Sequence, residues 1–302
     1  MVNSLGFVET VFADDLNCFK EFDCLGSDDS LLANLRECQQ ELHRWGAHQQ
    51  VTFDPSKESF HILDRERPVG ESFRLLGVLF DTKLTMRDAI METAAQAHSR
   101  VQMVLRTRRF NTDSETFRLY KAQVLSFLEH ATPAIHHATP FHLSSLDRVQ
   151  SSFLEAMQLT EAEAFVKHKL APLSTRRDIA LLGFLFRFAH GLAPRCFNEL
   201  FRFGQAAALP RRRSVDAHNR QIFDPIDGTQ SPALSRTVYS LVHTFNSLPP
   251  FVVESSNASA FQHQLQKATL KACKSGFPQW HRLLSDGVKQ TSLSTFSDFF
   301  ES

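Results

Sequence analysis

The chain has 302 residues, of which 42% are hydrophobic and 22% are charged, as expected for a globular protein with one large or two smaller domains. Lys plus Arg and Asp plus Glu each total 33, so the formal net charge is zero, and any binding to nucleic acid must come from local patches. No stretch approaches the roughly 18 to 20 apolar residues of a membrane span, which excludes a membrane-spanning protein.

The first elements in chain order are two short strands, predicted over residues 5–12 and 16–22. Asp14 and Asp15 then fall at the tight connection of a hairpin, where short acidic side chains tolerate turn geometry. From Ser27, which offers an N-cap, to Trp45, apolar residues recur at helical spacing. This segment predicts an amphipathic helix.

Two further strands are predicted over "VTFDPSKESFHIL" (51–63) and "ESFRLLGVLFDTKL" (71–84), with Gly77 inside the second. The pattern then becomes helical. Helices are predicted over residues 87–108, 114–130, 143–159, 176–190, 234–248 and 259–274. A loop over 204–231 interrupts them and a polar tail follows the last. The sequence therefore predicts an α+β fold, with antiparallel hairpins and a helix first and an all-α region after them.

The adjacent carboxylates of Asp14 and Asp15 have two interpretations. They can form an exposed acidic turn, or they can hold a hard divalent cation such as Mg²⁺, which prefers oxygen ligands. Because unpaired neighbouring aspartates repel each other, a bound cation would offset an electrostatic cost. Nucleotidyl transfer uses two such metals about 3.5 to 4 Å apart.

Several motifs occur in a fixed order along the chain. They are "FADDL", a helix that ends near Trp45, "DPSKESF", "LLGVLFDTKL", "LYKAQVLSFLEHATPAI" and "TFNSLPPFVVESSNASAFQHQL". This order resembles the C-terminal palm and thumb of reverse transcriptases from non-LTR (LINE-like) retrotransposons, and it covers nearly the whole chain. Phe12, His130 and Phe245 stand where the family more often has Tyr, Tyr and Trp.

The resemblance implies a palm portion with a primer-grip-like hairpin over residues 1–88 and a helical thumb or connection over 89–203. A linker over 204–232 and a C-terminal helical region with a polar tail over 233–302 would follow. It also implies an RNA template, a DNA primer and a two-metal Mg²⁺ site in the full-length parent, with Asp14 and Asp15 as catalytic metal ligands.

The same resemblance assigns roles to two further segments. Lys57 would approach the incoming nucleotide and protonate or neutralise the leaving pyrophosphate; the plainer alternative is an ordinary solvated lysine. Leu76, Gly77 and Val78 would belong to the hairpin that grips the primer end. Gly77 can also mark a close backbone approach, to another strand or to a primer.

In the family, a strand with another metal-binding aspartate and a nucleotide-positioning segment precede the Asp-Asp hairpin, whereas here only thirteen residues precede Asp14. We therefore expect no polymerase activity from this chain alone. We also expect apolar surface and strand edges that would pair with the absent half to stay exposed.

Two local basic clusters interrupt the neutral charge balance: Arg106, Arg108 and Arg109 in one, and residues 211–213 in the other. Either they contact nucleic-acid phosphates or they are solvated surface. A non-catalytic nucleic-acid-binding remnant and a helical interaction protein thus stay open as alternative functions. Five scattered cysteines indicate reduced thiols in an intracellular compartment, nuclear or cytoplasmic.

Overall fold

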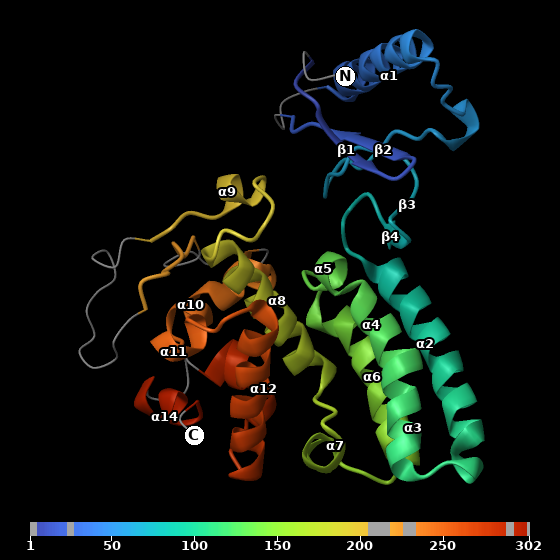
Figure 1. The fold of residues 1–302 in the computed structure, drawn as a ribbon. Helices are drawn as coiled ribbons and strands as arrows, with labels where there is room; N and C mark the ends of the chain where they lie inside the picture. Colours follow the sequence, from blue (N-terminus) through green and yellow to red (C-terminus); the bar gives the residue numbers. More distant parts are fainter. Residues whose placement is uncertain (1–4, 23–26, 205–217, 226–233, 288–292, 301–302) are drawn as a thin grey trace. The chain divides into compact units, whose positions relative to one another are not determined.

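The computed structural model describes residues 5–22, 27–204, 218–225, 234–287 and 293–300 (Figure 1). The chain divides into two compact units, Met1–Phe73 and Arg74–Ser302, and the division falls inside the predicted 1–88 segment. Helices dominate, and the described residues form two small antiparallel hairpins. The predicted α+β class is therefore confirmed.

The first unit begins with the predicted hairpin. Strands β1 (Val8–Phe12) and β2 (Asp15–Phe19) pair antiparallel, with Phe12 opposite Asp15. Ala13 and Asp14 are left as a two-residue loop, and Ala13 has a φ of 53°. A positive φ at the first loop residue suits the right-handed twist of a tight hairpin.

Helix α1 (Asp28–Gln49) follows as predicted. The Ser27 side chain accepts a hydrogen bond from the amide of Ser30, and Gln50 ends the helix in the left-handed conformation. One face of the hairpin and one face of α1 form a small core. Its members are the buried Phe7 and Cys38 and the partly buried Leu5, Cys18, Leu35 and Leu42.

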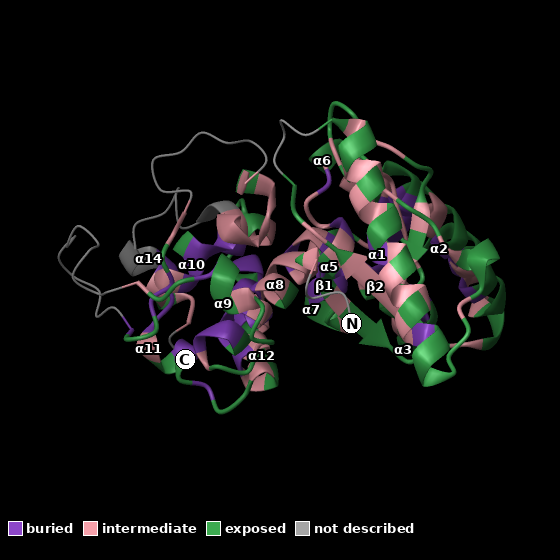
Figure 2. Cartoon of the chain, turned by 90° about the horizontal axis from the view of Figure 1, so that it is seen from above, coloured by how far each residue is buried: buried purple, intermediate pink, exposed green. Residues whose placement is uncertain are grey.

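Three apolar residues are exposed on the opposite face of the hairpin, where they alternate with the polar Thr10, Asp15 and Asn17. Val8 and Phe12 share one face of β1, because side chains alternate along a strand, and Val8 pairs with Phe19 of β2. Val8, Phe12 and Phe19 are 59%, 63% and 48% exposed. Figure 2 colours exposed residues green, and green is visible along this hairpin. The exposed apolar surface expected from the sequence is present at this hairpin.

The prediction of a strand over residues 51–63 is wrong. Pro55–Lys57 form a short 3₁₀ helix, and Asp54 caps it by accepting a hydrogen bond from the amide of Ser56. Proline suits the first position of a helical turn because it has no amide to donate, and this local preference outweighs the strand-like flanks. The extended pairing that the structure shows in this stretch is an isolated β-bridge between Ile62 and Val69.

The stretch 71–84 is a hairpin rather than one strand. Strands β3 (Phe73–Leu75) and β4 (Val78–Phe80) pair, and Leu76 and Gly77 form the turn with φ values of 49° and 82°. Two positive φ values are typical of the tightest hairpin turns. A Cβ at Gly77 would meet no atom within 4 Å, so its backbone conformation, and not a close approach of another strand, requires glycine.

The second unit is helical and has two hydrophobic cores. The first core is built by α2 (Arg87–Thr107), α3 (Asp113–Tyr120), α4 (Ser126–His130), α5 (Thr132–Ile135), α6 (Pro140–Ala156) and α7 (Glu161–His168). Lys121–Leu125 form a π-helical turn that joins α3 to α4. At the centre, the buried ring of Phe153 stacks on Tyr120 at 4.0 Å between ring centroids and meets Phe117 edge-on at 5.2 Å.

The second core lies around α8 and α12, where Phe186, Phe245 and Phe261 are buried. Its helices are α8 (Leu173–Ala189), α9 (Phe197–Leu200), α10 (Val242–Asn246), α11 (Pro250–Val253), α12 (Ala258–Lys274) and α14 (Leu293–Asp298). The predicted helices of this unit are thus confirmed in position, with the 234–248 segment beginning as 3₁₀ turns before α10.

Two predictions for the second unit need correction. Of the predicted 204–232 linker, residues 218–225 are described, and Ile222 is buried in the second core, where it bridges to Phe203. The predicted polar tail likewise buries Leu283, Leu284 and Phe296 in that core. In both segments the apolar side chains are scattered among polar ones without a helical or strand period, so the sequence did not predict their burial. Tertiary packing brings them together.

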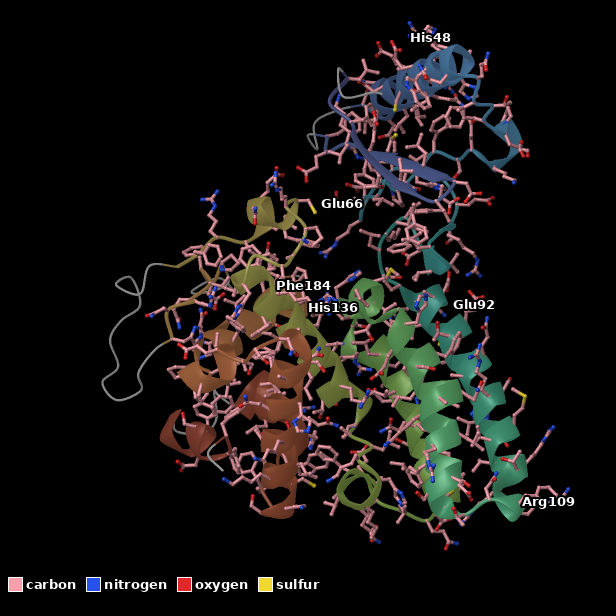
Figure 3. All side chains as sticks on the ribbon, in the orientation of Figure 1. His48, Glu66, Glu92, Arg109, His136 and Phe184 are labelled. Carbon is pink, nitrogen blue, oxygen red and sulfur yellow. The ribbon has the colours of Figure 1, made fainter. Side chains whose placement is uncertain are left out.

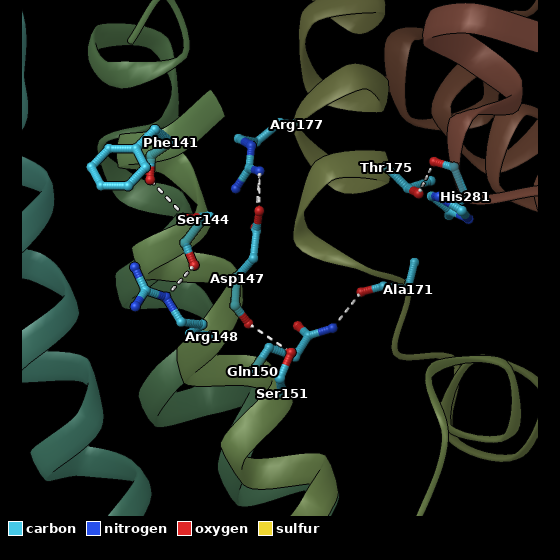
Figure 4. A network of polar contacts seen from close by, with 10 residues as sticks. All are labelled: Phe141, Ser144, Asp147, Arg148, Gln150, Ser151, Ala171, Thr175, Arg177 and His281. Carbon is cyan, nitrogen blue, oxygen red and sulfur yellow. Dashed lines mark hydrogen bonds and ion pairs between the residues drawn. The ribbon is translucent and has the colours of Figure 1, made fainter. Parts of the chain in front are cut away.

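Polar contacts join α8 to its neighbours, as Figure 4 shows in part. Arg177 pairs with Asp147 of α6 at 2.9 Å, and the side-chain amide of Gln150 donates to the carbonyl of Ala171 at 3.1 Å. The Thr175 hydroxyl donates to the carbonyl of His281 at 2.8 Å. No helix in the described part of the chain combines the length and apolarity that crossing a membrane requires.

Candidate functional site

The two aspartates lie where the hairpin turns. Asp14 is the second loop residue, Asp15 is the first residue of β2, and both are exposed. Within the described ranges, no three His, Cys, Asp or Glu side chains come together to hold a metal ion. Two exposed carboxylates alone would leave most positions of an octahedral Mg²⁺ ion to water, so these residues do not fit a two-metal centre.

Lys57 is exposed at the end of its 3₁₀ helix, on a loop anchored to α1 through the next residue. The Glu58 carboxylate accepts a hydrogen bond from Gln39 and contacts Nε2 of His43 at 3.1 Å. The hydrogen bond from Gln39 lowers the pKa of Glu58, with a smaller contribution from His43. In the described structure, no hydrogen bond or ion pair links Lys57 to the aspartates at the hairpin tip.

The β3–β4 hairpin presents its turn to solvent. Leu76 is 51% exposed at the tip and Gly77 is exposed beside it, whereas Val78 begins β4 and packs partly buried against the first core. Arg74 steadies the turn. Its guanidinium donates to the carbonyl of Gly77 at 3.2 Å and to both carboxylate oxygens of Glu92 in α2 at 2.8 Å.

Asp81 has a role that the sequence did not reveal. Its carboxylate accepts hydrogen bonds from the amides of Thr85 at 2.9 Å and Met86 at 2.7 Å, and from the Thr85 hydroxyl at 3.2 Å. All three bonds go to residues ahead of Arg87, so they fix the turn between β4 and α2, and the N-terminus of α2 has no side-chain cap. An aspartate followed four residues later by a threonine is the signal that could have indicated this turn.

The first arginine cluster divides into one structural and two exposed residues. Arg108 donates to the carbonyl of Ala156 at the end of α6, at 2.7 Å. Arg106 and Arg109 are exposed, and Arg109 lies near the turn between α2 and α3 (Figure 3). Its guanidinium lies 4.6 Å from the ring centroid of Phe110, which is 76% exposed.

The candidate residues are therefore not one constellation. Within the second unit, Gly77 lies ahead of α2 and Arg109 lies just beyond its far end, and a helix of 21 residues spans about 30 Å. The second predicted basic cluster, residues 211–213, lies outside the described residues. Comparisons of the chain with protein-family models, with curated proteins and with solved structures found no match.

Proposed function

We propose that this chain is the C-terminal palm and thumb portion of an RNA-directed DNA polymerase of the non-LTR retrotransposon type, and that it is inactive alone. Its partners would be an RNA template and a DNA primer. The observation that carries the proposal is the β1–β2 hairpin, which holds Asp14 and Asp15 at its tip and leaves an apolar face exposed.

The exposed face of the hairpin has a physical cost. A two-stranded sheet is marginally stable in water, and three or more strands or a packed helix are normally needed. Helix α1 covers part of one face, where Val11 stays 63% exposed, and Val8, Phe12 and Phe19 of the other face remain in solvent. Further palm elements packed over the hairpin would bury these side chains, so their exposure supports a palm that is incomplete in this chain.

The second hairpin supports the same assignment. Arg74 and Asp81 tie β3 and β4 to the first turns of α2, so the Leu76–Gly77 tip is held on a rigid helical base. A primer-gripping element needs such a base, because it must keep a strand end in place while the next nucleotide is added.

The proposal includes the absence of activity. Asp14 and Asp15 supply two oxygen-bearing side chains and no described residue completes a metal group with them, so Mg²⁺ would bind weakly. We expect no Mg²⁺-dependent cDNA synthesis by the chain on an RNA template with a DNA primer. Synthesis that is lost in the Asp14→Asn, Asp15→Asn double variant would overturn this expectation.

A second candidate, a non-catalytic nucleic-acid-binding remnant, rests on Arg106, Arg109 and Phe110. Exposed arginines neutralise phosphates, and an exposed ring can stack on a base. This surface requires neither the aspartates nor a metal. The two candidates therefore differ in what Mg²⁺ and the aspartates contribute to binding.

The deciding experiment measures binding of the full chain to a fluorescent RNA-template/DNA-primer duplex at increasing salt, with and without Mg²⁺. The palm-and-thumb proposal expects salt-sensitive binding that Mg²⁺ strengthens in the wild type but not in the Asp14→Asn, Asp15→Asn variant, because duplex phosphates would supply oxygen ligands that the two carboxylates lack. Binding that is the same in both proteins favours the non-catalytic remnant. If the chain does not bind the duplex even at low salt, both candidates are contradicted. The remaining alternative is then a helical protein that interacts with other proteins.

A further inference from the structure

Two cysteines from different elements meet in the small core of the first unit. Cys18 lies on β2 and is partly buried, and Cys38 lies on α1 and is 4% exposed. Phe7, Leu35 and Leu42 complete the apolar surroundings. Cys18 packs against the buried pair of Phe7 and Cys38, and both cysteines are free thiols.

We propose that Cys18 and Cys38 form a modification site, a thiol pair that hydrogen peroxide or another peroxide joins as an intramolecular disulfide. The bond would link the hairpin that carries Asp14 and Asp15 covalently to α1. The proposal rests on the packing of the two thiols and does not depend on the polymerase assignment.

The surroundings keep both thiols protonated at neutral pH. Burial raises the pKa of Cys18 to about 12, and the nearby Cys38 and Glu9 add to that rise. Burial also raises the pKa of Cys38, and the hydrogen bond from Cys18 partly offsets the rise. Because the thiolate is the reactive form, the reduced pair is the resting state and its first oxidation step is slow.

The second step is fast, because the fold holds both cysteines in one small core. In the first step, the more exposed Cys18 loses its proton and its sulfur attacks one peroxide oxygen. The O–O bond breaks, an S–O bond forms, and the released hydroxide takes up the proton as water. In the second step, the Cys38 sulfur attacks the Cys18 sulfur, the S–S bond forms, the S–O bond breaks, and a second water leaves.

The two steps balance: the thiols lose two protons and two electrons, and one peroxide becomes two waters. Cys18 should therefore pass quickly from sulfenic acid to disulfide and should not accumulate as the sulfinic acid. An isolated exposed thiol such as Cys196 has no such partner among the described residues and can be oxidised further.

The sequence allows a direct readout by peptide mapping. Cleavage after Lys20, Arg36 and Arg44 places Cys18, Cys24 and Cys38 on three separate peptides. The full chain is reduced, desalted, treated with hydrogen peroxide, alkylated with N-ethylmaleimide and digested without reductant. We expect the peptides of Cys18 and Cys38 to appear joined, two hydrogens lighter than their sum, and to separate again after reduction.

Cys24 provides the internal competitor, although it lies outside the described residues. In an unfolded chain Cys24 should form a disulfide with Cys18 about six times as often as Cys38 does, because the loop to be closed has six residues instead of twenty. In the native chain we expect the order to reverse, with the Cys18–Cys38 link about tenfold in excess. The same treatment in concentrated urea should restore the local preference.

Three variants complete the test. Cys24→Ser should keep the Cys18–Cys38 link, Cys196→Ser should leave it unchanged, and Cys38→Ser should abolish it. If Cys38→Ser fails to fold, the native-versus-urea ratio in the wild-type chain still decides. A Cys18–Cys24 link that dominates in the native chain, or oxidation of Cys18 to the sulfinic acid without any link to Cys38, would overturn the proposal.

Discussion

Replacing Asp81 by alanine tests how the β3–β4 hairpin is held on α2. The variant removes the carboxylate that accepts from the amides of Thr85 and Met86 and from the Thr85 hydroxyl. Loss of the hydrogen bonds from Thr85 costs about 1 kcal/mol. Met86 is 0% exposed, so its amide is poorly placed to turn to water, and an unsatisfied buried donor costs about 1 to 3 kcal/mol more. We expect the free energy of unfolding to fall by about 2 to 4 kcal/mol.

Two further variants separate these hydrogen bonds from general effects of charge. Asp81→Asn keeps one acceptor oxygen and places a donor where the other oxygen accepts, so it should recover only part of the lost stability. Asp88→Ala removes an exposed acidic residue from the first turn of α2, and the resulting loss of helix-dipole interaction should cost about 0.3 to 1 kcal/mol.

The assay is urea unfolding followed by far-ultraviolet circular dichroism, with the slope of the transition compared among the variants. If Asp81→Ala changes the free energy of unfolding by less than about 0.5 kcal/mol, the hydrogen-bonding argument is wrong. If Asp81→Asn is as unstable as Asp81→Ala, one acceptor oxygen is not enough to hold the turn.

Two other predictions concern the first helical core. Hydrogen bonds from Thr112 lower the pKa of Glu115 below its ordinary 4.5, so its stabilising contribution is present above 4.5 and is lost as the pH falls through the lowered folded value. Glu115→Gln keeps the capping box but removes the titrating group. At neutral pH the variant should therefore be less stable than the wild type, and this difference should shrink in acid. A difference that grows in acid would show that the hydrogen bonds from Thr112 do not lower the pKa of Glu115. Phe153→Ala should cost about 3 to 5 kcal/mol in urea unfolding, because the ring is fully buried against Tyr120 and Phe117; a cost below about 2 kcal/mol would mean that the core refills the cavity.

The sequence was sufficient for elements whose signals are local. Helices α1 and α2 have apolar residues at helical spacing, and Ser27, one of the four neighbouring residues 27–30 that could supply an N-cap, is the one that caps α1. The β1–β2 hairpin also followed from local alternation, and its aspartates lie at the tip as expected. Capping, turn chemistry and periodicity act within a few residues of the chain, so they can be read without knowing the fold.

Tertiary structure decided the features that depend on distant partners. Leu283 and Phe296 lie in a tail that reads as polar, yet packing against α8 and α12 buries them. The hydrogen bonds from Thr85 and Met86 to Asp81 also became visible only when β4 was placed against α2. In each case the stabilising contact is made by atoms whose proximity the sequence does not encode locally.

The same division holds for the candidate sites. The sequence alone identified the acidic pair and the arginine cluster, because each is a short motif, whereas it placed Gly77 inside a strand and not at a turn. Only the folded chain showed that no described third ligand joins Asp14 and Asp15, that Arg108 caps α6, and that Cys18 meets Cys38. Ligand sets and thiol pairs form when the chain folds back on itself, so tertiary structure, and not residue spacing, determines which motifs share a site.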